Sequence, residues 1–462
     1  MAFQYDVVVI GAGPGGYVAA IRASQLGLKV AVIEKDKAGG VCGNWGCIPS
    51  KALINQAEAF ESIHALEHMG VKVDSSGLNY TKVWEKSRGA ADRSGKGVVF
   101  LLKKNKVEQI AGTAVVTGPN EVTVNGSQKV TGKFLLLAAG SRPRQIPGFE
   151  FDENQVLSST GILAMEKLPK SLLILGSGAI GMEFAYVMKV FGVEVTVIEM
   201  MPRILPVEDK DTAAVVEKAF KTMGVKFLVG TKASKLVKSA KGVEVTVEKA
   251  DKTAEVLKAD KILVAVGRVP NSENLGLEKV GVKLDRGFVV THDYYQTDVK
   301  SIYAIGDLTP SPLLAHVASK EGEIAVEHMA GKAHEKRIDP LSIPGATYCE
   351  PQIASFGYSE ERAKEKGVAY KAYTFPYTGN GKANAIERQE GLVKVLFDPK
   401  THEIIGGHTV GAGATEIIHE LLLARKAELL PEDIATMVHA HPTLSESVME
   451  AARGVEGWAL HI

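Results

Sequence analysis

Two cysteines five positions apart are the residues of this chain whose types and spacing most directly suggest chemistry. Cys42 and Cys47 lie within residues 39–51, with glycines around them and a Pro-Ser-Lys sequence after them. Glycine lets the backbone turn tightly enough to bring two sulfur atoms together. Pro49 suits the first turn of a helix, and a thiol at a helix N-terminus near a lysine has a lowered pKa. The pattern predicts a working thiol pair.

Two other interpretations of these cysteines remain open at this point, a structural disulfide and half of a zinc site. A structural disulfide fits poorly with 3 cysteines in a chain of 462 residues for which we expect no secretory signal. A zinc site would need a second ligand pair at a similar spacing, and the sequence has no such Cys/His cluster. We therefore favour redox chemistry and expect no metal site.

The stretch Cys42-Gly-Asn-Trp-Gly-Cys47-Ile-Pro-Ser-Lys51 resembles the redox-disulfide motif of the FAD-dependent pyridine nucleotide–disulfide oxidoreductases. Its last four residues are similar to the branch of that family that acts on dihydrolipoamide. The resemblance implies a redox-active Cys42–Cys47 disulfide and a Lys51 that favours negative charge near the flavin and the thiolate. Three residues replace the Thr, Leu and Val of the commonest family form: Val41, Gly43 and Trp45.

The N-terminal residues form the pattern that would hold a dinucleotide. Residues 5–10 are a nearly continuous apolar run, typical of a buried parallel strand. A glycine-rich turn, a helix over 17–26 and a second strand over 29–33 follow, and Glu34 ends that strand. Glycines at a strand–helix turn allow close approach of a pyrophosphate, and the terminal acid accepts hydrogen bonds from a ribose. The three glycines of this βαβ fingerprint are Gly11, Gly13 and Gly16.

The same unit occurs a second time, after residues 172–175. Glu199 follows the first glycine of this copy by 23 residues, the separation that Glu34 has in the first copy. Two fingerprints imply two dinucleotides, or a duplicated domain with one inactive copy, but the second copy keeps its acid and its glycines. Those glycines are Gly176, Gly178 and Gly181.

The family resemblance assigns the first fingerprint to FAD and the second to the nicotinamide nucleotide. The carboxylate of Glu199 suits a free 2′-hydroxyl and repels a 2′-phosphate, so we expect NAD rather than NADP. The family also pairs the lysine of the disulfide motif with a glutamate in the second fingerprint helix. Glu183 occupies the matching position.

Four further positions are assigned to cofactor contact by resemblance. Residues 134–139 with Gly140 resemble the strand that leaves the FAD domain, and residues 263–270 with Gly267 resemble the return from the NAD domain. Residues 297–307 are predicted as a buried strand that ends at Asp307, which matches the aspartate that holds the ribityl chain. Ala315 lies at a helix start similar to one that abuts the flavin. By themselves these would be ordinary strand ends or helix caps.

The last quarter of the chain changes to an α+β pattern that resembles the family's dimerisation domain. Strands are predicted over 393–397 and 404–408 and a helix over 416–424, and Cys349 is predicted to be a buried, small apolar residue. Near the end, His441 precedes Pro442, and Glu446 follows. By itself this is a loop with a capping box at a helix start. The resemblance makes His441 an acid–base residue that reaches the other subunit's disulfide, and Glu446 the residue that orients it.

These observations predict an α/β fold with two Rossmann-like dinucleotide-binding domains and a C-terminal α+β dimerisation domain. The predicted boundaries are 1–147 for the FAD-binding domain, 148–270 for the NAD-binding domain, 271–343 for a central domain that completes the FAD site, and 344–462 for the interface domain. Lys and Arg number 54, as do Asp and Glu, so no charge excess indicates nucleic acid or a membrane surface. We expect a cytoplasmic protein or a processed organellar form.

The expected function follows from the resemblance. It is reoxidation of protein-bound dihydrolipoamide with NAD through FAD, in a homodimer that shares its active sites and serves 2-oxoacid dehydrogenase or glycine cleavage complexes through their lipoyl domains. A reductase for glutathione or a related disulfide is the nearest alternative, and Glu199 counts against it. A non-catalytic cofactor-binding subunit is the alternative from another class. Retention of both cysteines and of the His/Glu pair argues against that alternative.

Overall fold

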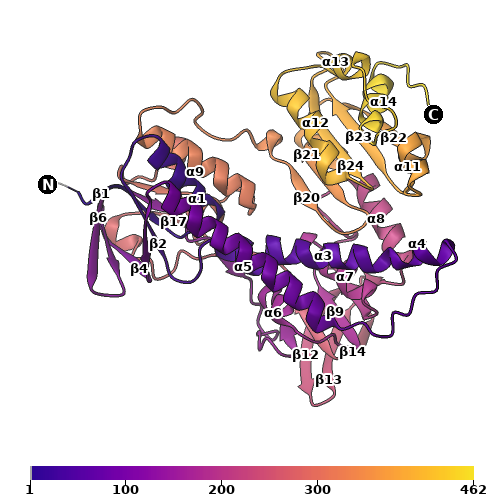
Figure 1. The fold of residues 1–462 in the computed structure, drawn as a ribbon, viewed down its shortest axis with the longest axis horizontal. Helices are drawn as coiled ribbons and strands as arrows, with labels where there is room; N and C mark the ends of the chain where they lie inside the picture. The colour runs from indigo at the N-terminus through magenta and orange to yellow at the C-terminus, as the bar shows by residue number, and fades with distance from the viewer. Residues whose placement is uncertain (1–2) are drawn as a thin grey trace.

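The computed structural model describes residues 3–462, which fold into three lobes (Figure 1). The first lobe is built on a sheet with the strand order β3-β2-β1-β6-β5-β4, in which β19 also pairs with β6. Strands β3, β2, β1, β6 and β19 are parallel, whereas β4 and β5 form an antiparallel extension. The bounds are β1 Tyr5–Ile10, β2 Val30–Glu34, β3 Glu108–Ala111, β4 Ala114–Gly118, β5 Glu121–Val124, β6 Gln128–Leu137 and β19 Ile302–Ala304.

Helices cover this first sheet, which explains why its central strands are apolar throughout. Helices α1 (Pro14–Gln25) and α9 (Ala315–Met329) pack against each other, and α5 (Tyr80–Lys104) packs against α1. Helix α1 begins at Pro14, three residues before the predicted start, because Pro is tolerated at the first helical position. The strand predicted over 297–307 is shorter, since β19 covers only three residues. Gly306, at φ +63°, ends it, and Asp307 lies in a 3₁₀ turn.

The second lobe repeats the βαβ arrangement of the first. Its sheet has the order β11-β10-β9-β15-β8, and every pair of neighbours is parallel. An antiparallel meander of three strands follows α8 and β11 in the chain. The bounds are β8 Val156–Leu157, α6 Ser159–Ala164, β9 Ser171–Leu175, α7 Ala179–Val190, β10 Glu194–Ile198, α8 Lys210–Thr222, β11 Lys226–Leu228, β12 Lys232–Ser239, β13 Gly242–Glu248, β14 Ala254–Ala259 and β15 Lys261–Val264.

The chain passes between the first two lobes twice, and the two crossings lie side by side. Strand β7 (Ser141–Pro143) leaves the first lobe and pairs antiparallel with β16 (Arg268–Pro270), which returns from the second. Each crossing strand is preceded by a glycine with positive φ, Gly140 at +68° and Gly267 at +108°. The sequence predicted a crossing at both positions, and the pairing of the two adds a contact between residues far apart in the chain.

The C-terminal lobe is an antiparallel sheet with the order β20-β21-β24-β23-β22. The predicted strands over 393–397 and 404–408 are confirmed as neighbours, and the predicted helix over 416–424 extends two residues further at each end as α12. Cys349 is free and fully buried, as predicted. The bounds are β20 Gly345–Thr347, β21 Ile353–Gly357, α10 Glu360–Lys366, β22 Lys371–Pro376, α11 Gly381–Ala385, β23 Leu392–Phe397, β24 Ile404–Val410, α12 Ala414–Lys426, α13 Pro431–Thr436 and α14 Glu446–Val455. The fold class predicted from the sequence is confirmed.

One helix of the first lobe lies where all three lobes meet. Figure 1 shows α3 (Cys47–Glu61) between the C-terminal lobe and α7 of the second lobe, and α3 contacts both α7 and α5. Leu53, Ile54 and Ala57 of α3 share one hydrophobic core with Met182 of α7 and Ile353 of β21. After α3 the chain continues into a second, short helix, α4 (Ile63–His68).

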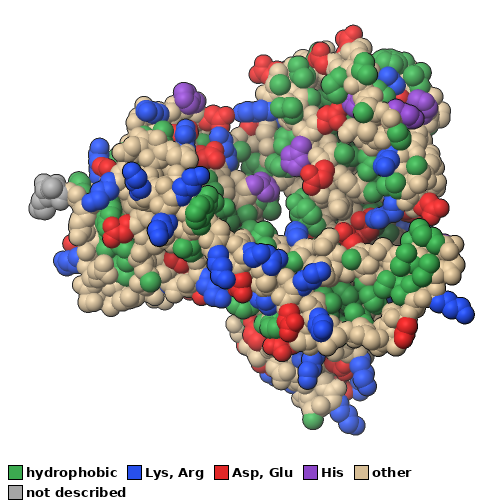
Figure 2. All heavy atoms as spheres, in the orientation of Figure 1, with side chains coloured by type: hydrophobic (Ala, Val, Ile, Leu, Met, Phe, Trp, Pro, Cys, Tyr) green, Lys and Arg blue, Asp and Glu red, His purple; other side chains and the backbone are tan. Residues whose placement is uncertain are grey.

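Charges of both signs are interspersed over the face drawn in Figure 2, as the balanced composition predicts. Within residues 3–462, none of the helices combines the length and the apolar character that crossing a bilayer requires.

Candidate active site

Cys42 and Cys47 form a disulfide that joins the short helix α2 (Gly40–Trp45) to the first residue of α3. Their Cα atoms are 4.7 Å apart, within the range of ordinary disulfides. Gly46, between the two helices, has little room for a side chain, because a Cβ there would lie 3.1 Å from the Val41 carbonyl oxygen. Cys47 thus lies at a helix N-terminus, where the partial positive charge stabilises a thiolate.

Lys51 connects the disulfide helix to the other two lobes. Its Nζ contacts both carboxylate oxygens of Glu183, at 2.8 and 2.9 Å, and lies 4.4 Å from the centre of the Tyr348 ring. Glu183, on α7, has a side chain that is 8% exposed, and it also accepts the Tyr348 backbone N–H at 3.1 Å. The positive charge of Lys51 is therefore balanced by a buried carboxylate, and this ion pair ties the disulfide helix to the second fingerprint helix.

The two glycine-rich turns have the same geometry. Gly11 and Gly176 have φ values of +104° and +101°, a region that side chains rarely adopt. A Cβ on Gly16 would lie 1.9 Å from the Gly11 carbonyl oxygen, and the corresponding distance from Gly181 to Gly176 is 2.0 Å. Only glycine fits at either position, so each turn is held tightly against the start of its helix.

The two fingerprint acids also occupy matched positions. Glu34 accepts hydrogen bonds from the backbone N–H groups of Ala12 at 2.7 Å and Asp36 at 2.9 Å. Glu199 accepts from the N–H and the hydroxyl of Ser177 at 2.8 and 2.7 Å, and from the N–H of Met201 at 2.8 Å. Each carboxylate is thereby fixed at the end of its strand, beside the turn that would receive a nucleotide.

The N-termini of α1 and α7 fit the phosphates of two dinucleotides. Their N-cap residues are Gly13 and Gly178, and no side chain caps the free N–H groups of either helix. A Cβ on Gly178 would meet no atom within 4 Å, so this turn faces open space. An uncapped helix N-terminus with free backbone N–H groups binds phosphate. The residues of both fingerprints are therefore suited to the two cofactors.

Asp307 lies in a polar cluster at the crossing of β7 and β16. The hydroxyl of Ser141 donates to the Asp307 carboxylate, and the Arg268 Nε donates to that hydroxyl at 2.7 Å. Arg268 Nε is also 3.9 Å from the Asp307 carboxylate. Burial lowers the pKa of Arg268, and the charge of Asp307 opposes this. Ser141 and Arg268 were not predicted as site residues, although each directly follows a glycine, Gly140 or Gly267, that was.

A buried carboxyl group beside Asp307 was also missed. Glu321, on α9, accepts the Gly306 N–H at 2.6 Å and the Ser311 hydroxyl at 2.5 Å. Burial raises its pKa to about 7, although both hydrogen bonds act in the opposite direction. Glu321 holds the turn that carries Asp307 against α9, the helix that begins at Ala315. Glu321 lies inside an amphipathic helix, where a glutamate is ordinary, so nothing in the sequence indicated that it is buried or bonded to the Asp307 turn.

His441 and Glu446 are brought together at the start of α14. The Nδ1 of His441 lies 3.0 Å from Glu446 Oε1, and Glu446 Oε2 accepts the Thr443 N–H at 2.8 Å. Burial would raise the pKa of Glu446, but the Thr443 N–H and the His441 imidazole outweigh it and hold the pKa below its usual range. The His441 side chain is 75% exposed in the single chain. The predicted capping box is half formed, because the Thr443 hydroxyl donates to Ala440 instead.

Two side chains that the sequence analysis left without a role support this segment. Asn380 is buried, and its amide nitrogen donates to the Thr443 carbonyl at 3.0 Å and to the Ser447 hydroxyl at 2.9 Å. His439 pairs with Glu420 through a contact of 2.7 Å, and its side chain is 3% exposed. Both anchor the loop on either side of His441, and neither could be paired with its partner from sequence spacing.

For the lipoamide activity that the sequence leads us to expect, with His441 as its acid–base residue, we predict that Asn380→Ala slows lipoamide turnover without affecting flavin reduction by NADH. The substitution removes two hydrogen bonds that hold the His441 loop, and misplacement of a catalytic group by about 1 Å costs up to about 100-fold in rate. The measurement is kcat with lipoamide beside NADH–ferricyanide turnover. Asn120→Ala is the control, since its amide also donates to two backbone oxygens, at 2.9 and 2.8 Å, within the first lobe. Equal lipoamide rates in the two variants would contradict the positioning role.

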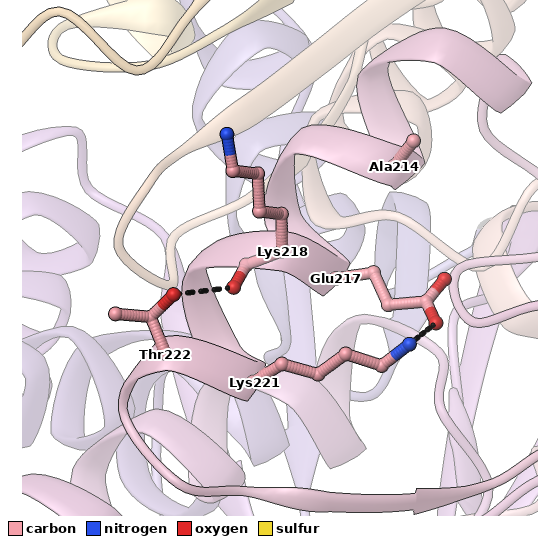
Figure 3. A pocket seen from close by; sticks show the side chains of 5 residues that line it. All are labelled: Ala214, Glu217, Lys218, Lys221 and Thr222. Carbon is pink, nitrogen blue, oxygen red and sulfur yellow. Dashed lines mark hydrogen bonds and ion pairs between the residues drawn. The ribbon is translucent and has the colours of Figure 1, made fainter.

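The hollow drawn in Figure 3 is separate from these residues. It is lined by one face of α8, where Glu217 pairs with Lys221 at 2.6 Å and the Thr222 hydroxyl donates to the Lys218 carbonyl at 3.1 Å. All of its lining residues belong to that helix, and none is a predicted site residue. The candidate site is therefore defined by the disulfide, the two fingerprints and the His441 pair rather than by this surface hollow.

Comparison with known proteins gives the same picture over the whole chain. Residues 5–322 match the family described as pyridine nucleotide-disulphide oxidoreductase, and residues 343–452 match its dimerisation domain. A dihydrolipoyl dehydrogenase of Rhizobium etli is 43% identical over 480 aligned positions and covers 100% of both chains. A dihydrolipoyl dehydrogenase of Corynebacterium glutamicum is 45% identical and covers 99% of both.

A solved structure agrees with these matches. The crystal structure of LpdA from Mycobacterium tuberculosis superimposes with a TM-score of 0.89 at 28% identity, covering 97% of this chain and 99% of that one. The glycine turns and the disulfide lie within the first matched range, and the five-stranded sheet of the C-terminal lobe lies within the second. The chain therefore belongs to the pyridine nucleotide-disulphide oxidoreductase family.

Proposed function

We propose that this chain catalyses the oxidation of dihydrolipoamide to lipoamide with NAD, which yields NADH and a proton. The observation that carries the proposal is the Cys42–Cys47 disulfide at the N-terminus of α3, tied through Lys51 to Glu183 on the second nucleotide-binding helix. This arrangement joins a thiol-exchange centre to both nucleotide-binding lobes. The relatives named above carry the corresponding activity in their names.

The family resemblance suggests the thiol steps, and the arrangement of the residues supports them. His441 accepts a proton from one dihydrolipoyl thiol, and Glu446 holds the imidazole through Nδ1 and stabilises its cationic form. The substrate thiolate attacks Cys42, so that the S–S bond breaks and Cys47 leaves as a thiolate at the helix N-terminus. The second substrate thiol then displaces Cys42 and closes the cyclic disulfide. The electron pair of the substrate now resides on the cysteine pair.

The chain uses FAD and NAD as cofactors. FAD, when bound, connects two-electron thiol chemistry to hydride exchange with NAD. Two groups of residues are proposed to hold these molecules. For FAD they are Gly11, Gly13, Gly16, Glu34, Lys51, Gly140, Asp307 and Ala315, and for NAD they are Gly176, Gly178, Gly181, Glu183, Glu199 and Gly267, with Ser141 and Arg268 supporting Asp307.

The protein is a homodimer, in agreement with its dimerisation domain, and it has a role in lipoyl-containing complexes. We propose that its partners are the lipoyl domains of 2-oxoacid dehydrogenase or glycine cleavage proteins, and that His441 of each subunit serves the disulfide of the other. The exposure of His441 in the single chain supports the second point. We propose a cytoplasmic location, which the match to bacterial relatives over the whole chain supports.

Steady-state turnover of the purified, FAD-loaded protein tests this function. NADH and NADPH are each combined with lipoamide and with oxidised glutathione, and we expect fast turnover only for NADH with lipoamide. Turnover of NADPH with glutathione would place the chain among glutathione-type reductases instead. Absence of turnover with every disulfide, with FAD bound, would indicate a non-catalytic cofactor-binding subunit.

We predict that Glu199→Gln weakens the preference for NADH over NADPH. The glutamine has a single acceptor oxygen, so it keeps the hydrogen bond from either the Ser177 N–H or the Met201 N–H but not both, and it removes the negative charge that repels a 2′-phosphate. The ratio of kcat/KM for NADH to that for NADPH should fall by about 10-fold or more, since 1–3 kcal/mol is typical for such a polar contact. Glu217→Gln, on the surface of α8, should leave the ratio unchanged. An unchanged ratio in Glu199→Gln would remove the specificity role.

A further inference from the structure

Arg88, on α5, lies against the end of α2, within the segment that joins the two redox cysteines. Its guanidinium carbon is 4.2 Å from the centre of the Trp45 ring, and its Nη2 donates to the Asn44 carbonyl at 2.7 Å. Asn44 and Trp45 are two of the four residues between Cys42 and Cys47. An arginine stacked on an aromatic ring and bonded to a carbonyl is held in one orientation. A cation of α5 is therefore fixed beside the segment between the cysteines. It has no role in the two nucleotide fingerprints or in the proposed thiol steps.

This cation lacks a balancing partner. Its Nη1 is buried, and in the part of the chain that the structure describes it has no hydrogen-bond partner. Burial lowers the pKa of Arg88, and the charge of Asp92 opposes this without forming an ion pair with it. Lys51 differs, because Glu183 balances its charge directly. In the described residues, Arg88 is thus a cation beside the cysteine segment whose charge no bonded carboxylate cancels.

One of the residues that depart from the commonest family motif forms the seat for Arg88, and a second lies beside it. Trp45 supplies the ring on which the guanidinium stacks. Gly43 has no side chain, and a Cβ there would lie 3.7 Å from Ser94 Oγ of α5, so a larger residue would project into that helix. A Cβ on Gly95 of α5 would lie 3.4 Å from Asn44 Oδ1. Helices α2 and α5 therefore pack closely at the place where Arg88 contacts Asn44 and Trp45.

Reduction of the disulfide creates a negative charge on the cysteine pair that flanks Asn44 and Trp45. Breaking the S–S bond takes two electrons and one proton, and it yields one thiol and one thiolate. The two electrons come from the dihydrolipoyl dithiol, which becomes the cyclic disulfide. The substrate's other proton leaves through His441. An uncancelled cation near a new thiolate stabilises it and raises the reduction potential of the pair. We propose that Arg88, seated on Trp45, is a positioning residue that sets the reduction potential of the Cys42–Cys47 disulfide, an inference that rests on the proposed redox function.

The test is a thiol–disulfide equilibrium on the FAD-loaded protein. The protein is equilibrated without oxygen in buffers of defined dihydrolipoamide-to-lipoamide ratio, quenched with acid, and its reduced cysteines are counted by alkylation and mass spectrometry. We expect Arg88→Gln to need about a 10-fold higher ratio for half reduction, equal to about 30 mV for a two-electron couple. Arg88→Lys keeps the charge, so it should shift the ratio for half reduction less than Arg88→Gln does. Trp45→Val removes the ring on which Arg88 stacks, and its shift should fall between those of the two Arg88 variants.

Arg93→Gln is the matched control, since Arg93 is exposed on the same helix and loses the same charge. Screening by salt should leave its midpoint within about 2-fold of the unmodified protein. An unchanged midpoint in Arg88→Gln and Trp45→Val, or an equal shift in Arg93→Gln, would overturn the proposal. If Arg88→Gln does not bind FAD, the other two variants test the proposal. The midpoint ratio should then shift more in Trp45→Val than in Arg88→Lys, and the opposite order would contradict the proposal. Failure of the unmodified protein to be reduced at any ratio would instead reject the proposed function itself.

Discussion

Replacement of Cys47 by serine is expected to abolish lipoamide turnover while FAD stays bound. A hydroxyl cannot form the disulfide, so the substrate thiolate has no sulfur to attack and no thiolate leaves at the N-terminus of α3. Both nucleotide-binding turns lie on other elements and keep their geometry. The measurements are lipoamide turnover, which should fall to the detection limit, and flavin content from the visible absorbance. Ferricyanide reduction by NADH should continue, because it does not require the disulfide.

Cys42→Ser should give the same loss by a different route. The remaining Cys47 is then a free thiol at the helix N-terminus, reactive toward alkylating agents, whereas in Cys47→Ser the reactive thiol is Cys42. Cys349→Ala is the control, since that cysteine is buried and free and has no part in the thiol steps. Full lipoamide activity in either serine variant would show that the disulfide is not the redox centre.

The parts of this site that the sequence could predict are those whose chemistry is local. Each fingerprint acid is tied to the turn 22 residues before it, by Ala12 to Glu34 and by Ser177 to Glu199, and that interval is set by one strand, one helix and one turn. The cysteine pair likewise spans five residues. Regular elements have fixed rises per residue, so such intervals carry geometric information.

Contacts between distant segments could not be predicted in this way. Lys394 lies in an apolar strand, is 1% exposed, and contacts Asp209 at 3.0 Å across 185 residues of sequence. Burial would lower its pKa, but its hydrogen bonds with Asp211, Glu360 and Asp209 outweigh this and raise it. Nothing in the alternation of strand residues indicates such partners. Asn380 and Arg88 were missed for the same reason, because their functional contacts depend on how lobes and helices pack.

Replacement of His441 by alanine is the second large effect that we expect. The variant loses the group that accepts the thiol proton, and a general base is typically worth about 10²–10⁴-fold. Glu446, whose pKa lies below its usual range, remains a carboxylate at neutral pH and would be left without the imidazole it orients. Reduction of the oxidised protein by dihydrolipoamide, followed by stopped flow, should slow by this factor. Reduction by NADH should change little, because no proton of a substrate thiol is transferred in that half-reaction.

Glu446→Gln separates orientation from proton transfer in the same experiment. Glutamine still accepts the Thr443 N–H, so the loop keeps that bond, but it no longer stabilises a cationic imidazole. Its rate should fall between those of the unmodified protein and His441→Ala. His402→Ala is the control, since His402 also pairs with a carboxylate of the C-terminal lobe, Glu456, at 3.2 Å. If His441→Ala were reduced by dihydrolipoamide as fast as His402→Ala, the base would be another group, and the exposure of His441 would have to be explained by the subunit interface alone.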